Sequence, residues 1–102
     1  MGKCKITVLR REFYKDLADE YIPVEIGPCH MMKEGDVFIT GGDFGASMPE
    51  GFCDMAWQAI GVQARTLAWG GKVFGFDDNH IACCNDGCRP VIFKLEAIDD
   101  DE

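Results

Sequence analysis

Several features that would define a broad class of protein are missing from this sequence. No apolar run approaches the roughly 20 residues that a membrane-spanning helix requires, and Met1 to Ile6 lead into a strand pattern without the apolar stretch of a signal peptide. Basic residues are few, with 10 Lys and Arg against 18 Asp and Glu, and they form no stripe for phosphate contacts. We therefore expect a cytoplasmic protein that binds neither membranes nor nucleic acid.

Cysteine, in contrast, is frequent, because six cysteines occur in 102 residues. None of them forms the C-x-x-C spacing of zinc ribbons, thioredoxin-like motifs or common iron–sulfur sites. Without a signal peptide, these residues are expected to be thiols rather than a disulfide framework, since the cytosol keeps most cysteines reduced. A free cysteine usually packs as a small hydrophobe, so core packing is the alternative for each one.

The composition is that of a folded domain, with 47% hydrophobic and 27% charged residues. A chain of this length buries roughly two thirds of the surface that its unfolded form exposes, so one core is expected. We predict a single globular domain over residues 1–98, without linkers or internal repeats. The acidic run from Asp99 to Glu102 predicts a solvated C-terminal tail over residues 99–102.

Hydrophobic periodicity and turn residues predict the order of the elements. We expect a strand that starts at Lys3, a short helix, a second strand, a principal helix and a C-terminal hairpin, at residues 3–14, 15–21, 37–40, 53–67 and 80–98. This order favours an α+β fold in which the principal helix covers one face of an antiparallel or mixed sheet.

Apolar side chains at helical spacing predict the core-facing stripe of the principal helix, which comprises Cys53, Trp57, Ile60, Ala64 and Leu67. Ser47 and Glu50 have the form of a capping box, which predicts that the helix begins in this segment. Gly61 costs about 1 kcal/mol relative to alanine and predicts a bend between two shorter helices. Gly70-Gly71 is the expected C-terminal stop.

Asn85-Asp86-Gly87 predicts the hairpin turn, with a positive φ at Gly87. Because adjacent strand residues point to opposite faces, Cys83 and Cys84 are expected on different sides of the sheet. A three-residue loop would place Cys84 opposite Cys88. We interpret that arrangement as simple side-chain contact, with a strained redox pair as the alternative.

Two cysteines have surroundings that favour chemistry. Cys29 follows Gly27-Pro28 on an irregular loop and precedes His30, an arrangement typical of reactive or ligating residues. Cys53 lies in the first turn of the principal helix, where unpaired N–H groups and the helix dipole favour a thiolate. Core packing remains the alternative for Cys53, and a surface position is the alternative to a ligand or base for His80.

Four segments resemble a family of small uncharacterised cysteine-containing proteins of anaerobic bacteria and archaea. They are Gly27-Pro28-Cys29, Lys33-Glu34-Gly35-Asp36, residues 49–57 (Pro-Glu-Gly-Phe-Cys-Asp-Met-Ala-Trp) and residues 83–94 (Cys-Cys-Asn-Asp-Gly-Cys-Arg-Pro-Val-Ile-Phe-Lys). Together they extend the resemblance over nearly the whole chain.

The resemblance implies a shared site made of four thiols, namely Cys29, Cys53, Cys83 and Cys84. Cys4 and Cys88 lie outside the family's pattern, and proline is common in the family at the position of His30. The anaerobic cytoplasm that the resemblance implies would keep the thiols reduced.

Our leading hypothesis is that these cysteines converge on a soft or borderline metal, zinc or an iron centre, with four metal ligands: Cys29, Cys53, Cys83 and Cys84. A second hypothesis is a small thiol enzyme with Cys53 or Cys29 as nucleophile and His80 or His30 as base.

The third hypothesis is a non-catalytic accessory module that docks on a larger enzyme or binds a small ligand in an aromatic pocket near Trp57 and Phe93. The cysteines would then be core residues. Core packing is in any case the prediction for four aromatic residues, Phe52, Trp57, Trp69 and Phe93.

Overall fold

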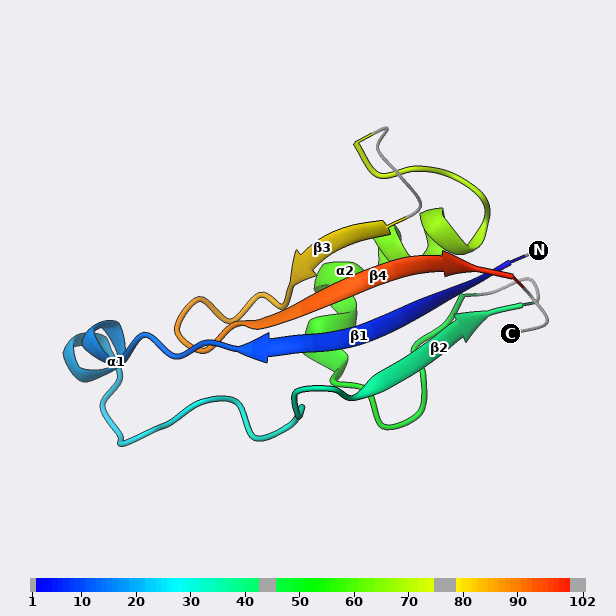
Figure 1. Ribbon diagram of the computed structural model, residues 1–102. Helices are drawn as coiled ribbons and strands as arrows, with labels where there is room; N and C mark the ends of the chain where they lie inside the picture. The colour runs from blue at the N-terminus through cyan, green and yellow to red at the C-terminus, as the bar shows by residue number, and fades with distance from the viewer. Residues whose placement is uncertain (1, 43–45, 75–78, 100–102) are drawn as a thin grey trace.

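The computed structural model describes residues 2–42, 46–74 and 79–99 and shows a four-stranded antiparallel sheet with one long helix on one of its faces (Figure 1). In chain order the elements are β1 (Lys3–Arg11), α1 (Lys15–Tyr21), β2 (Val37–Gly41), α2 (Asp54–Ala68), β3 (Asn79–Cys83) and β4 (Val91–Ile98). The strand order is β2-β1-β4-β3, and α2 packs against all four strands. The predicted α+β fold, with an antiparallel sheet, a covering helix and a C-terminal hairpin, is confirmed.

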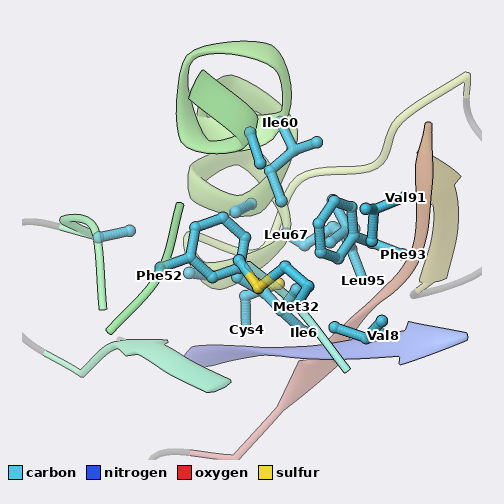
Figure 2. Close-up of a cluster of buried hydrophobic side chains, with 14 residues drawn as sticks. Cys4, Ile6, Val8, Met32, Phe52, Ile60, Leu67, Val91, Phe93 and Leu95 are labelled. Atoms are coloured by element: carbon cyan, nitrogen blue, oxygen red, sulfur yellow. The ribbon is translucent and has the colours of Figure 1, made fainter. Parts of the chain in front are cut away.

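The core lies between the sheet and α2. Cys4, Ile6 and Val8 of β1 alternate with more exposed residues and are buried, as the strand pattern predicts. Figure 2 shows them grouped with Phe52 and with Phe93 of β4, whose ring centroids lie 5.5 Å apart. Each large apolar side chain contributes roughly 1.5–3 kcal/mol on burial, so this cluster provides much of the stability of the fold.

The start of α2 differs from the prediction. The helix begins at Asp54 and not near Ser47, so the predicted capping box is wrong. The reason is Gly51, whose φ of +80° turns the chain out of any helical path that started earlier. Cys53 becomes the N-cap, and its carbonyl oxygen accepts the first helical hydrogen bond from the N–H of Trp57 at 2.9 Å.

The predicted bend at Gly61 is also wrong, because α2 continues through this residue as one helix. A Cβ atom added to Gly61 would lie 3.1 Å from the indole of Trp57, so glycine lets the ring pack closely against the helix. The end of α2 agrees with the prediction. Gly70 has a φ of +88°, and the N–H of Gly71 donates to the carbonyl oxygen of Thr66 at 2.8 Å, which closes the helix.

β3 and β4 form the predicted hairpin, but their connection spans residues 84–90 instead of three residues. The N–H of Cys84 donates to the carbonyl oxygen of Val91 at 3.1 Å, so Cys84 lies beside Val91. The predicted placement of Cys84 opposite Cys88 is therefore wrong, since the strand pairing ends before the chain reaches Cys88.

The hairpin loop is shaped by Asp86 rather than by Gly87. The predicted positive φ at Gly87 is wrong, since this residue is not among those with left-handed backbone. Instead, Oδ1 of Asp86 accepts hydrogen bonds from the N–H groups of Cys88 at 3.0 Å and Arg89 at 3.1 Å. An aspartate that bonds the backbone two and three residues ahead builds the turn without positive φ.

Two predictions at the periphery can also be compared with the structure. Trp69 is 53% exposed at the end of α2, so its predicted core position is wrong, whereas Phe52 and Phe93 are buried. Of the predicted tail, residues 100–102 lie outside the described residues.

In the described part of the chain, no helix has both the length and the apolar character needed to cross a bilayer.

Candidate functional site

Three cysteines that lie far apart in the sequence line one pocket of about 230 Å³. The pocket lies between the segment that follows α1, the start of α2 and the hairpin loop, and we call it the sulfur pocket. Its lining residues are Cys29, Met31, Cys53, Met55, Ala56, Cys84, Asn85, Asp86 and Arg89. Three of the four cysteines predicted as metal ligands therefore line the same pocket.

Two hydrogen bonds hold Cys29 in the pocket. Nη1 of Arg11 donates a hydrogen bond to the carbonyl oxygen of Cys29 at 2.8 Å, which ties this irregular segment to the end of β1. The sulfur of Cys29 accepts the N–H of Met31 at 3.4 Å. These two contacts orient a cysteine that belongs to no helix or strand.

Cys53 and Cys84 reach the pocket from the ends of regular elements, since Cys53 immediately precedes α2 and Cys84 immediately follows β3. As the N-cap of α2, Cys53 lies at the positive end of the helix, and within the described residues its thiol makes no capping hydrogen bond. The sulfur of Cys84 accepts the N–H of Val91 at 3.3 Å. The adjacent Cys83 is exposed and does not line the pocket, which agrees with the expected alternation along the strand.

A charged pair forms the polar wall of the pocket. Nε of Arg89 donates to Oδ2 of Asp86 at 3.0 Å, and this bond raises the pKa of Arg89, which also interacts electrostatically with Cys29 and Cys88. Burial acts to raise the pKa of Asp86, but the hydrogen bonds from Cys88 and Arg89 outweigh it and lower that pKa overall. The guanidinium is therefore a permanent positive charge beside the thiols.

The other two cysteines lie elsewhere. The thiol of Cys88 donates to the carbonyl oxygen of Tyr14 at 3.6 Å, at the base of the segment that leads into α1. Cys4 is fully buried on β1, and this burial raises its pKa to about 12. Neither of these residues lines the sulfur pocket.

Neither histidine is part of the pocket lining. His30 is exposed, and the ring of His80 on β3 packs against Phe74 with ring centroids 5.5 Å apart. The basic side chain at the thiols is Arg89 instead. Phe93 is fully buried in the core, so it is not placed to line a ligand site.

The pocket is small, and its thiols surround it without meeting at a point. Among the residues described, no group of three or more His, Cys, Asp or Glu side chains is placed to hold a single metal ion. The volume of about 230 Å³ is below the roughly 300–1,000 Å³ of pockets for drug-sized ligands. It is therefore too small for a nucleotide-sized cofactor.

Of the pocket lining, only the three cysteines were predicted as site residues, and Met31, Met55 and Arg89 are the chemically most relevant residues that were missed. Met31 and Met55 each follow a pocket cysteine by two positions, so the repeated spacing Cys-x-Met, at Cys29 and Cys53, was an available signal. Thioether and thiolate sulfurs are both soft donors, which makes this pairing chemically coherent. Arg89 had no comparable signal, because only the shape of the hairpin loop brings it to the thiols.

Comparisons with models of protein families, with curated proteins and with solved structures found no match. The function must therefore be inferred from the chemistry of the pocket. Thiols, thioethers and a guanidinium in one small space suit soft cations, thiol-reactive electrophiles and small anions.

Proposed function

We propose that this protein binds a soft or borderline metal centre, zinc or iron, in the sulfur pocket. The observation that carries the proposal is that Cys29, Cys53 and Cys84, from three separate segments, line one small pocket. Free cysteines are more often scattered packing residues, so three at one pocket need a reason. Cysteine thiolates are favoured ligands of both zinc and iron–sulfur centres.

The surroundings of the sulfurs support this proposal. The N–H groups of Met31 and Val91 point at the sulfurs of Cys29 and Cys84, at 3.4 and 3.3 Å, and such bonds stabilise negative charge on a ligating sulfur. The guanidinium of Arg89 offsets part of the charge that several thiolates would bring together. Ligation of one zinc ion, with Zn–S of about 2.3 Å, requires sulfurs roughly 3.8 Å apart. An iron–sulfur centre is held by several thiolates around a cluster, so it does not require the sulfurs to lie that close together.

The test is metal uptake by protein purified anaerobically under reducing conditions. We expect stoichiometric zinc or iron by elemental analysis, or uptake of either after reconstitution, with an absorption band from sulfur to iron if iron binds. Cys29→Ser, Cys53→Ser and Cys84→Ser should each weaken binding by about 10-fold to 100-fold or more. Cys83→Ser is the matched control, because it changes the adjacent thiol on the opposite face.

Two outcomes would overturn the metal proposal. Wild-type protein that neither contains nor takes up zinc or iron would remove it. Equal loss of metal in Cys83→Ser and Cys84→Ser would show that binding does not depend on the pocket.

A second candidate function, a cysteine nucleophile that acts on a small anionic substrate, is favoured by one observation. Arg89 lines the same pocket as Cys29, so an anion bound at the guanidinium would lie beside a thiol. No histidine lines the pocket, so this mechanism depends on thiolate formed without a histidine base.

Competing alkylating reagents test this second candidate. The measured quantity is the ratio of the alkylation rate with anionic iodoacetate to that with neutral iodoacetamide. This ratio should be higher at Cys29 than at Cys83 in the same molecule, and Arg89→Gln should abolish the difference. If Cys29 and Cys83 show the same ratio of rates in wild-type protein, the anion-directed nucleophile is excluded.

The setting proposed for either function is a reducing cytoplasm. All six cysteines are free, as expected where disulfides are rare. The formal net charge of −8 makes nucleic acid an unsuitable partner. A small ligand or another protein is the partner that fits this surface.

A further inference from the structure

α1 belongs to a segment that projects from the rest of the molecule, which we call the arm (residues 12–25). Figure 1 shows α1 beyond the end of β1, away from the sheet and from α2. In the described part of the chain, α1 packs against no other helix or strand. A helix of seven residues is well below the roughly 12–15 that are marginally stable alone, so it benefits from a surface to pack on.

The arm has an apolar surface and a strong negative charge. Tyr21 and Val24 are 71% and 66% exposed, and Tyr14 and Leu17 are also exposed. Residues 12–25 contain five acidic residues and one basic residue. Their net charge of −4 is half of the formal net charge of −8. A surface that receives the arm should therefore be apolar and positively charged.

The face of the sheet opposite α2, which we call the open face, has these properties. Val37, Ile39 and Ile81 point outward on it and are 49%, 42% and 55% exposed. The register places its charged residues on β1 and β4, and Nζ of Lys94 lies 3.5 Å from Oε2 of Glu96. The charged residues are Lys3, Lys5, Arg10, Lys94 and Glu96. The open face is thus locally positive on an acidic protein.

A hollow on the open face offers a position for an aromatic or aliphatic side chain. It has a volume of about 430 Å³ and is lined by Lys5, Ile39, Glu96 and Ile98. Apolar walls with one positive and one negative group at the rim suit the ring and hydroxyl of a tyrosine.

We propose that the open face receives the arm of a second copy of this chain, with Tyr21 in the hollow and the acidic residues of the arm beside Lys3, Lys5 and Lys94. A two-fold dimer makes this contact twice, since each copy offers one arm and one open face. Helix α2 covers the opposite face of the sheet, so the proposed contact does not require a metal in the sulfur pocket.

Sedimentation equilibrium of the full chain tests the interface. We expect a dimer at micromolar concentration that weakens as salt is raised, because salt screens the charge contacts. Tyr21→Ala and Lys5→Glu should each raise the dissociation constant by about tenfold or more. The arm substitution Glu20→Lys alone should act likewise, whereas Lys5→Glu combined with Glu20→Lys should recover most of the affinity by restoring opposite charges.

These positions are exposed or half-buried, so circular dichroism is expected to show folded protein for every variant. Wild-type protein that remains monomeric up to about 100 μM overturns the proposal. A dimer that Tyr21→Ala and Lys5→Glu leave unchanged overturns it equally, because association would then use another surface.

Discussion

Cys4 lies in the core between the sheet and α2, whereas Cys29, Cys53 and Cys84 lie around a pocket built by loops and a helix start. On β1, strand alternation directs the side chain inward, and apolar neighbours seal the thiol from water. At the pocket, irregular chain brings backbone N–H groups and a guanidinium to the sulfurs. The same residue type is therefore fully buried in one region, and partly buried at the edge of the core beside polar groups in the other.

The core and the pocket also differ in the interactions that stabilise them. The core depends on apolar area, and its side chains come from elements whose periodicity is regular. The pocket depends on individual polar contacts, such as those from Arg11 to Cys29 and from Arg89 to Asp86. Substitutions should therefore separate stability in the core from chemistry at the pocket.

The largest contrast is expected in thiol reactivity. A pKa of about 12 leaves Cys4 with roughly a thousandth of the thiolate of an ordinary thiol at pH 8, and burial also blocks reagents. Native Cys4 should react with iodoacetamide at least about a hundredfold more slowly than the exposed Cys83, as measured by peptide mass spectrometry. Similar rates for Cys4 and Cys83 in folded protein would contradict a sealed core.

The next largest effect is expected on stability. Phe93→Ala should lower the free energy of unfolding by about 3–5 kcal/mol, because Phe93 is fully buried against Phe52. Urea denaturation measures this loss. The half-buried Cys29 serves as the pocket control, and Cys29→Ala should cost no more than about 1–2 kcal/mol. Comparable losses would mean that the pocket is part of the stabilising core.

A smaller, pH-dependent effect is expected at the hairpin loop. Asp86→Ala should cost about 1–2 kcal/mol at pH 7, because the N–H groups of Cys88 and Arg89 lose their acceptor. The pKa of Asp86 is lowered on folding, so its contribution is present above the ordinary aspartate pKa of about 4 and is lost as pH falls through the lower folded value.

The measurement for Asp86 is the difference in stability between wild type and variant, followed from pH 7 to pH 2. Asp19→Ala is the control, because its ion pair with Lys15 is largely exposed and should contribute less than about 0.5 kcal/mol. A difference for Asp86→Ala that widens as pH falls would refute the assigned role of the carboxylate.

The smallest effect is expected for Cys83→Ser. Cys83 is exposed on the open face, so the substitution should change stability by less than about 0.5 kcal/mol and leave the reactivity of the pocket thiols unchanged. Denaturation and alkylation of the same samples provide both measurements. A change in pocket reactivity would show that the two faces of β3 are coupled.

Much of the fold could be predicted from short-range patterns. Alternation identified the buried face of β1, and good helix formers identified α1. Apolar spacing identified Ile60, Ala64 and Leu67 of the buried stripe of α2, whereas Cys53 and Trp57 are half-buried. Three predictions failed where a local signal had more than one solution. Gly51 delays the helix start that the capping box predicted, Gly61 leaves room for the ring of Trp57 within one uninterrupted helix, and Asp86 forms the turn expected from Gly87.

The candidate site could be predicted only in part. The resemblance implied a shared set of four cysteines, and three of them line one pocket while Cys83 points away. Metal binding remains a prediction. Arg89 could not be placed beside Cys29 from the sequence, because no pattern indicates which loops approach each other.

By itself, the sequence determined the elements, the faces they bury and the residues available for chemistry, because periodicity and turn chemistry act between near neighbours along the chain. Only the tertiary structure decided that Cys29, Cys53 and Cys84 line one pocket while Cys4 is buried among apolar side chains. The physical reason is that their approach requires packing of the core to bring together segments separated by more than 20 residues, which no local preference specifies.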